Sequence, residues 1–437
     1  MSIRRCRKEV SMSNFAEQRP IPREIGGITP DDSAAIDDLL NGVHEDRRVS
    51  EPKIEVVATG TNGGVLQQIE AFLKVRYRFR YNQATNKVEW KPLDKAEEVF
   101  TDMRDYDYNT VLRKIKYEGL SCSMTTLRTM LASDFVPPYD PYWEYFEHLP
   151  AWDGQTDYIE MLASTVETSN SAFWRKCFKK WIVALTGSLI EPKVINHTAI
   201  IFSGAQGIGK TRWFGRILPE ELRRYQFAGT LNLRDKDSQV KLSECPLIVM
   251  DELENMGGKN IDALKELITK EHIYLRRAYA YTHENYVRRA SFAGSVNHKE
   301  FLVDMTGNRR FLCFEVNRIN PEHQIPLDRV YAQALHLFHS GFQYWFDQNE
   351  IAELNASNEE FRTISVEEEQ LMSYFEPCSE EDDPEYLKTT QILQVVANAS
   401  KVRGLSDQRL GRVLRAKGFL RVKKGDRWMY AVKRKTT

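Results

Sequence analysis

A glycine-rich segment, GAQGIGKT at 204–211, follows directly on the apolar run TAIIFSG at 198–204. The pattern G-x-x-x-x-G-K-[ST] after a strand constrains the chain strongly, because it requires a strand–loop–helix unit. Glycines let backbone N–H groups wrap phosphate oxygens without Cβ clashes, and the following helix adds the positive end of its dipole. The alternative is an ordinary glycine-rich turn. We expect ATP phosphates to bind Gly204, Ala205, Gln206, Gly207, Ile208, Gly209, Lys210 and Thr211.

Two side chains of this loop have predicted roles of their own. Lys210 is expected to reach the β- and γ-phosphates, and the hydroxyl of Thr211 is expected to ligate Mg²⁺. An acid pair, Asp251 and Glu252, ends the apolar run PLIVMDE and lies 41 residues after Lys210. Ligands bind at the carboxyl ends of parallel strands, so we expect Asp251 to hold Mg²⁺ through water and Glu252 to act as general base. An apolar strand that ends in two acids is also common by chance.

Polar residues beside two further strand candidates complete the predicted site. Asn297 ends ASFAGSVN, a strand that we expect between the phosphate strand and the acid strand, where the amide can orient the lytic water. A capping or turn asparagine is the alternative. Arg309 and Arg310 follow a glycine turn in DMTGNRRF. An arginine supplied by a neighbouring subunit accelerates phosphoryl transfer. Surface salt bridging is the alternative, and the sequence does not separate the two arginines.

The order of these motifs resembles the virulence-associated protein E family of phages and mobile elements, over roughly residues 66–318. The resemblance implies an AAA+ ATPase related to superfamily 3 helicases, assembled as a ring with ATP between subunits. Asn297 is retained, although GSVNH replaces the more Thr-rich GTTN of the family. The segments that carry the resemblance are YRFRYN and VEW (77–90), PYDPYWEYFEHLPAWDG (138–154), GAQGIGKT, DELE, GSVN and TGNRRF.

The resemblance also marks the stretch before the strand that ends at Asn297. The family tends to have an Arg, a Tyr three residues on, and an Arg nine residues later, which Arg276, Tyr279 and Arg288 match. In related ring helicases this stretch is a hairpin that lines the pore and grips single-stranded DNA. Residues 273–290 contain four Tyr and four Arg, Arg277 among them, a mixture that suits base stacking with phosphate neutralisation. The alternative is an exposed hairpin packed on its own sheet.

The C-terminal end is strongly basic. Residues 401–437 contain 13 Lys/Arg and two acids, a local net charge of 13 − 2 = +11. From residue 386 the pattern predicts helix, turn, helix and a hairpin turning at Gly425–Asp426, which indicates a winged-helix module. A solvated basic tail or a protein-docking wing is the alternative. The predicted DNA phosphate contacts, which make affinity salt-dependent, are Arg409, Arg412, Arg415, Lys423, Lys424 and Arg427.

The bulk composition sets limits. The formal net charge is −1, so the chain as a whole does not attract polyanions. Its six cysteines form no close pair and offer no metal-ligand spacing. Apolar runs such as PLIVM fall far below the roughly 20 residues of a membrane span, and the basic N-terminus lacks an apolar stretch behind it. We expect a soluble protein of the bacterial host cytosol with no membrane partner.

The predicted fold class is α/β, an AAA+-type P-loop ATPase core with a helical N-terminal domain and a C-terminal winged-helix domain. We expect residues 1–50 to be poorly ordered, 51–165 to be mainly helical, 166–365 to form the ATPase domain, 366–385 to be an acidic linker and 386–437 to form the basic winged-helix-like domain.

The leading hypothesis is an ATP-dependent DNA helicase or translocase that acts as a ring, a homo-hexamer, in replication of a phage or mobile element. Single-stranded DNA would occupy the pore and duplex DNA the C-terminal domain. One alternative is a DNA-bound ATPase switch, an initiator or loader that does not unwind. Another is a defence or signalling NTPase whose basic C-terminus docks protein.

Overall fold

The computed structural model describes residues 64–94, 99–232, 235–253, 256, 258–277, 280–302, 307–400, 402 and 404–435. These residues form a mixed α/β protein with three sheets of four or more strands. The segment 1–50, expected to be poorly ordered, and Tyr279, expected to contact DNA, lie outside the described residues.

Residues 65–139 form a small sheet with helices packed on it. In β1, Tyr77 and Phe79 are buried and Arg78 is exposed, because alternate side chains of a strand point to opposite faces. The part expected to be mainly helical therefore also contains a sheet, with strand order β3-β2-β1-β4. The elements are α1 (Val65–Arg76), β1 (Tyr77–Asn82), β2 (Lys87–Pro92), β3 (Thr101–Asp102), α2 (Asp105–Tyr117), α3 (Met124–Leu131) and β4 (Pro138–Tyr139).

The central sheet has the order β5-β12-β6-β11-β8-β7. All strands from β12 to β7 run parallel, and only β5 is antiparallel, pairing with β12. The strands are β5 (Val166–Thr168), β6 (Ala199–Ser203), β7 (Phe227–Ala228), β8 (Leu247–Met250), β11 (Ser291–Val296) and β12 (Phe311–Ile319). A short antiparallel hairpin, β9 (Ile273–Leu275) with β10 (Glu284–Tyr286), precedes β11.

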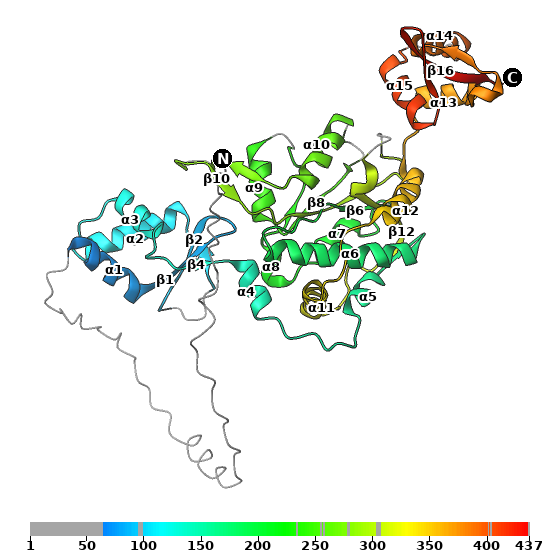
Figure 1. Ribbon diagram of the computed structural model, residues 1–437. Coiled ribbons are helices and arrows are strands. Elements are labelled where there is room, and N and C mark those ends of the chain that lie inside the picture. The colour runs from blue at the N-terminus through cyan, green and yellow to red at the C-terminus, as the bar shows by residue number, and fades with distance from the viewer. Residues whose placement is uncertain are drawn as a thin grey trace, which may run out of the picture. The chain divides into compact units, whose positions relative to one another are not determined.

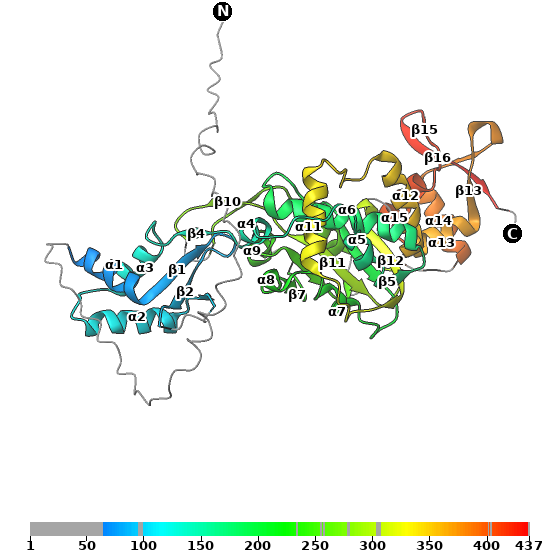
Figure 2. The ribbon, with the colours of Figure 1, turned by 90° about the horizontal axis from the view of Figure 1, so that it is seen from below.

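Helices cover both faces of the central sheet. In β6, Ile200 and Phe202 belong to one core cluster, whereas Ala199 and Ile201 belong to another on the opposite face. Burial on both faces explains why the strands read as continuous apolar runs. Figure 1 shows α9 and α10 on one side of the strands and α6 and α11 on the other, and Figure 2 shows α5, α6 and α11 from below. These helices are α5 (Tyr158–Ala163), α6 (Ser171–Ile190), α9 (Lys236–Glu244), α10 (Gly258–Thr269) and α11 (Leu327–His339).

Residues 141–165 pack with the central sheet, although the sequence assigned them to the N-terminal domain. Tyr142 and Phe146 of α4 (Pro141–Glu147) and Ile159 of α5 are buried in the same core cluster as Trp174. Apolar side chains that share one core fold together, so residues 141–165 belong with the central sheet. The remaining helices of the central part are α7 (Lys210–Phe214), α8 (Glu220–Arg223) and α12 (Gln348–Asn358), with 3₁₀ turns η3 (Asn308–Arg310) and η4 (Glu359–Phe361).

The C-terminal part has the predicted helix, helix and hairpin. The elements are α13 (Val366–Tyr374), β13 (Phe375–Pro377), η5 (Glu380–Asp382), β14 (Glu385–Leu387), α14 (Thr389–Ser400), α15 (Asp407–Ala416), β15 (Arg421–Lys424) and β16 (Arg427–Arg434). Strands β15 and β16 pair antiparallel around Gly425, whose positive φ of 60° suits the turn. Side chains of α13, α14, α15 and β16 share one core.

We expected residues 366–385 to be an acidic linker. The structure corrects this expectation, because the segment is folded. Ser365 caps α13 by accepting from the Glu368 N–H, and acids in a first turn suit the helix dipole. Glu367 and Glu368 are both buried. Glu368 receives hydrogen bonds from Arg362 and an ion pair from Lys417, Nζ to Oε1 2.9 Å. Buried carboxylates need such partners, so these acids are part of the fold.

Among the described residues, no helix is long and apolar enough to cross a membrane.

Candidate functional site

The loop after β6 needs glycine at two close approaches. Gly204 and Gly209 both have positive φ, 151° and 98°. A Cβ at Gly204 would stand 2.7 Å from the carbonyl oxygen of Val316, and one at Gly209 would stand 3.0 Å from a Pro321 side-chain carbon. Any larger residue would therefore push the loop away from β12 and the chain after it. The predicted loop, residues 204–209, runs from the carboxyl end of β6 into α7.

Lys210 is held against this loop. Its side chain is only 5% exposed, and Nζ donates to the carbonyl oxygens of Gly204 (2.6 Å) and Ala205 (2.9 Å). The ammonium group therefore lies on the same face of the loop as those two carbonyls. A lysine fixed in this way is placed to act on an anion bound by the loop, since its charge is already directed there.

Three oxygen-bearing side chains converge beside Lys210. Thr211 Oγ1 donates to Asp251 Oδ2 at 3.0 Å, and Ser295 Oγ donates to Asp251 Oδ1. The two hydroxyl oxygens are 3.5 Å apart. Thr211 starts α7, Asp251 follows β8, and Ser295 belongs to β11 between β6 and β8. The structure thus brings together the two predicted metal ligands and adds Ser295, which the sequence reasoning missed.

The donor set at Asp251 suits a hard divalent cation. Mg²⁺ binds one or two carboxylates, keeps several waters, and takes oxygen ligands. Here one carboxylate and two hydroxyls meet at the carboxyl end of the sheet. Among the described residues, no group of three or more His, Cys, Asp or Glu side chains could hold a metal ion. The residues therefore fit a cation that is completed by water and phosphate rather than by a protein cage.

Glu252 occupies an unusual backbone conformation. Its φ is 53°, the left-handed region that non-glycine residues rarely adopt. Such conformations cluster at functional sites, where the surrounding structure holds them. The side chain is exposed and lines a cavity of about 290 Å³ together with Asp251, Asn232 and Asn260. The acid pair therefore faces open space beside the loop rather than the core.

Asn297 follows the last residue of β11. Strand β11 pairs parallel with β6 on one side and β8 on the other, which confirms the predicted position of this strand. Gly294 makes that position possible, because a Cβ there would stand 2.4 Å from Leu253 and 2.9 Å from the carbonyl oxygen of Met250. Strand β11 thus packs closely against the chain that carries the acid pair.

Arg309 and Arg310 lie at the opposite end of the sheet from the loop. They precede Phe311, which pairs with Ala199 at the amino end of β6. Arg309 is exposed, and both arginines line a cavity of about 660 Å³ with His197. Burial, and then the neighbouring Arg309 charge, lower the pKa of Arg310. The loop lies five residues of β6 away, roughly 15 Å at 3.3 Å per residue.

The predicted hairpin is present as β9 and β10, and its arginines differ in setting. Arg276 is exposed. Arg277 is ion-paired with Glu244, donates to the carbonyl oxygen of Thr85 at 3.0 Å and lies over the ring of Tyr286. It therefore links the hairpin to α9 and to the turn after β1.

Arg288 requires a correction. It is 1% exposed and donates to the carbonyl oxygen of Ile268 at 3.2 Å, while Nε and the other terminal nitrogen have no partner among the described residues. Desolvation by burial lowers the pKa of Arg288 to about 9. A guanidinium enclosed in the protein does not reach a DNA phosphate, so the predicted DNA contact does not fit this position.

The C-terminal basic residues lie on the surface. All six predicted contacts are exposed, three on α15 and three on the β15–β16 hairpin: Arg409, Arg412, Arg415, Lys423, Lys424 and Arg427. Three of them also have local partners. Lys424 Nζ lies 3.3 Å from the ring centroid of Tyr386, Arg409 lies 3.9 Å from Glu367, and Arg415 donates to the carbonyl oxygen of Gly411.

The chain was compared with solved structures and with curated proteins. The chain resembles the solved apo structure of the NrS-1 C terminal region (305-718), with 13% identity, a TM-score of 0.45, and coverage of 85% of this chain and 99% of that chain. The A form apo structure of the same region gives 13% identity, a TM-score of 0.42, and coverage of 84% and 99%. TM-scores this low support no inference about fold or function. No curated protein matches the chain.

A family model matches the part that contains the loop, the acid pair, Ser295 and the two arginines. It describes the virulence-associated protein E-like domain and covers residues 146–363. By this match and by its motifs, the chain belongs to the virulence-associated protein E-like family.

Proposed function

We propose that this chain is a Mg²⁺-dependent P-loop ATPase with an AAA+-type core. The observation that carries the proposal is the convergence of Lys210, Thr211 and Asp251 at the carboxyl end of a parallel sheet. Three groups of the kinds that bind phosphate and its cation meet there, although Asp251 is 40 residues from Thr211. A glycine turn without such a role needs neither the lysine nor the acid.

Each residue has a distinct task in this proposal. The loop N–H groups at 204–209 bind the phosphates, and Lys210 neutralises charge on the β- and γ-phosphates. Thr211 and Asp251 would hold Mg²⁺, which would offset negative charge on the phosphates when bound. Glu252 takes a proton from the attacking water, and Asn297 orients that water. The exposed position of Glu252 beside the loop is compatible with that role.

The position of the arginines supports catalysis between subunits. Arg309 and Arg310 lie at the amino end of β12, and their own loop lies at the carboxyl end of β6. A fully extended arginine does not span a separation of roughly 15 Å, the length of a five-residue strand. One or both of them therefore act on ATP bound by a neighbour, which implies a ring and, by resemblance, a homo-hexamer.

The DNA role rests on charge and aromatic side chains. Arg276 and the 99% exposed Tyr281 lie between β9 and β10 and are placed to contact single-stranded DNA in a pore. The C-terminal part is proposed as a winged-helix module that binds duplex DNA through α15 and the hairpin. Together these features favour an ATP-driven helicase or translocase that serves replication of a phage or mobile element.

Strand displacement on a forked duplex tests this function. Wild-type protein is expected to hydrolyse ATP and displace a strand, and Lys210→Ala to do neither. Hydrolysis by Lys210→Ala at the wild-type rate would overturn the phosphate assignment. DNA-stimulated hydrolysis without displacement would identify a DNA-bound switch, such as an initiator or loader. Duplex-DNA binding that is insensitive to salt and unchanged by deletion of residues 386–437 would favour the protein-docking alternative.

A further inference from the structure

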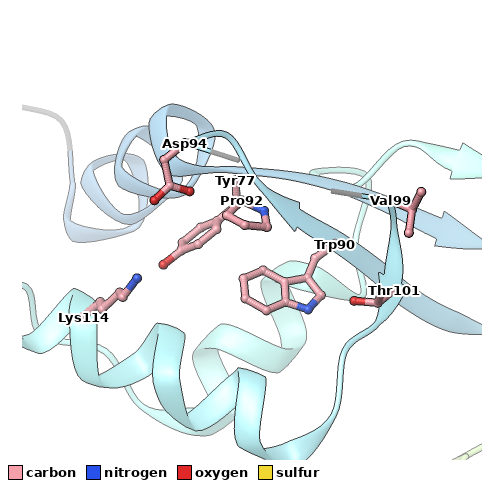
Figure 3. Close-up of a pocket in the computed structure, with 7 residues that line it drawn as sticks. All are labelled: Tyr77, Trp90, Pro92, Asp94, Val99, Thr101 and Lys114. Carbon is pink, nitrogen blue, oxygen red and sulfur yellow. The ribbon is translucent and has the colours of Figure 1, made fainter. Parts of the chain in front are cut away.

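A third cavity lies in the N-terminal part and is lined by none of the proposed ATPase residues. It has a volume of about 360 Å³, within the range of small-ligand sites, roughly 300–1,000 Å³. Strands β1, β2 and β3 form one side and α2 the other (Figure 3). The residues that line it are Tyr77, Trp90, Pro92, Asp94, Val99, Thr101 and Lys114.

Tyr77 directs a buried hydroxyl into this space. The residue is 3% exposed, and its hydroxyl has no hydrogen-bond partner among the described residues. In Figure 3 the hydroxyl points into the cavity toward Lys114. Buried hydroxyls are nearly always hydrogen-bonded, because leaving one unpaired forfeits its hydration without compensation. The unused hydrogen-bonding capacity of this hydroxyl is therefore best explained by a ligand that enters the cavity.

Trp90 supplies an aromatic wall beside this hydroxyl. Its ring is partly buried, and its centroid lies 5.3 Å from that of Tyr77 with 59° between the planes. The two rings are tilted rather than stacked, so a flat group can lie against the indole without displacing Tyr77. Aromatic faces of this kind stack nucleobases with little dependence on sequence.

Charged groups at the rim favour a ligand with both an anionic and a polar end. Lys114 is exposed on α2, and its Nζ lies 5.7 Å from the ring centroid of Tyr77. Asp94 is a hydrogen-bond acceptor at the end of the cavity that is near Tyr77 and Pro92. Residues 64–139 contain 12 Lys/Arg and 10 Asp/Glu, a net charge of 12 − 10 = +2. This part of the chain is thus mildly attractive to phosphate, unlike the whole.

We propose that this cavity binds one unpaired nucleotide. The base stacks on Trp90, its edge exchanges hydrogen bonds with the Tyr77 hydroxyl and Asp94, and its phosphate pairs with Lys114. Free nucleotides and nucleotides within a single strand share this chemistry. The site contains none of the proposed ATPase residues, so this proposal does not depend on the ATPase proposal.

Photo-cross-linking tests the site directly. Full-length protein is irradiated with a 5-iododeoxyuridine-containing oligonucleotide or with free 5-iododeoxyuridine monophosphate, and the cross-linked peptide is identified by mass spectrometry. The expected product is the peptide that contains Trp90. Its formation with the oligonucleotide identifies a strand as the source, and its formation with the free nucleotide identifies a mononucleotide. Repetition in Lys210→Ala protein keeps failure of the ATPase proposal distinct from failure of this one.

Three variants and one control decide the outcome. Trp90→Leu is expected to lower the yield at the pocket, measured by cross-links to Tyr77, about fivefold or more, since base stacking contributes at least that much. Tyr77→Phe removes only the hydroxyl, and Lys114→Gln only an exposed charge, so both fold and lower the Trp90 cross-link. Lys116→Gln makes the same charge change on α2 outside the cavity and leaves the yield unchanged. Absence of any cross-link at Trp90 or Tyr77, or equal yields in Tyr77→Phe, Lys114→Gln and wild type, overturns the proposal.

Discussion

The hydroxyl of Thr211 donates a hydrogen bond to Asp251, with 3.0 Å between Oγ1 and Oδ2. The residue before Asp251 ends β8, and Thr211 follows the loop after β6, yet these strands are not neighbours. Strand β11 separates them, so the two residues meet across about 10 Å of sheet, two strand spacings. Ser295, on the intervening strand, donates to the other oxygen of the same carboxylate. The site is therefore built from three elements, not two.

Ser295→Ala is expected to weaken the proposed Mg²⁺ site. Of the two hydroxyls that donate to Asp251, only that of Thr211 would remain in this variant. Removal of such a supporting hydrogen bond typically costs about 10-fold in metal affinity. The measurement is the Mg²⁺ concentration for half-maximal ATPase rate. Ser295→Thr retains the hydroxyl and serves as the control, and Asp251→Asn is expected to abolish turnover. An unchanged Mg²⁺ dependence in Ser295→Ala would show that Ser295 only packs the strand.

Mixed subunits are expected to regain activity that each variant has lost. Lys210→Ala lacks phosphate binding, and the double variant Arg309→Ala/Arg310→Ala lacks the arginines, a loss of about 10³-fold or more if an arginine finger acts. In an equal mixture about one interface in four joins an intact loop to intact arginines, as cyclic symmetry dictates. The ATPase rate of the mixture is the readout. The single variants, mixed in the same way, then separate Arg309 from Arg310, and failure of every mixture argues for catalysis within one subunit.

The two hairpin arginines are expected to respond differently to removal. Arg276→Ala should reduce DNA-stimulated ATPase turnover several-fold and leave basal turnover intact, because the side chain is exposed. Arg277→Ala should also lower the melting temperature, since it breaks the pair with Glu244 and the contact with Thr85. Basal and stimulated rates, measured beside thermal unfolding, distinguish these effects. Equal loss of basal and stimulated turnover in Arg276→Ala would indicate a folding role.

Arg288→Met is expected to stabilise the protein. Its guanidinium is buried, and the described residues offer it no carboxylate partner, so its desolvation is poorly compensated. Replacement of buried charge by an apolar side chain of similar length typically raises the free energy of unfolding by about 1–3 kcal/mol. Urea unfolding at constant pH measures the change. Arg288→Lys keeps the charge in place and should give no such gain; a large loss of stability in Arg288→Met would mean that the Ile268 contact dominates.

The C-terminal part is expected to lose stability in acid through Glu368. Burial alone would raise the pKa of this carboxyl, but hydrogen bonds from Arg362 and Lys417 outweigh burial and lower it. A lowered folded-state pKa means that the stability is fully present above the ordinary value of 4.5 and is lost as pH falls through the folded value. Glu368→Gln should flatten this dependence. Urea midpoints from about pH 6 to pH 3 test it; identical curves for Glu368→Gln and wild type would contradict it.

Local patterns predicted the strands that position the site, and long-range pairing explains what they missed. The run ending at Asp251 and the glycine loop specify strand ends, and β11 lies between β6 and β8 as expected. Ser295 escaped notice because a serine inside an apolar strand carries no motif. Its alternation with Asn297, two residues on, was the available signal, because alternate residues share a face.

The buried charges were the other source of error. Glu367 and Glu368 read as part of a solvated acidic run, because their neighbours in sequence are acids. Glu368 pairs with Lys417, and Glu367 accepts a hydrogen bond from the Ser406 N–H, and both partners lie far along the chain. Arg288 likewise sits among Tyr and Arg residues that suggest a surface, but it is enclosed against α10. Sequence shows that a charge is present, whereas only packing shows where it is buried.

The separation of Lys210 and Arg310 to opposite ends of one sheet also limits the symmetry of any active assembly. A two-fold dimer joins the same surface of both copies, so it would complete both sites only if the loop and the arginines lay within that one surface. In the proposed cross-subunit mechanism, a head-to-tail contact between the loop end of one copy and the arginine end of the next completes the site without that requirement. An open row of such copies leaves a loop end without a partner at one terminus and an arginine end without a partner at the other. A closed ring is the finite arrangement in which every copy both receives and supplies a contact.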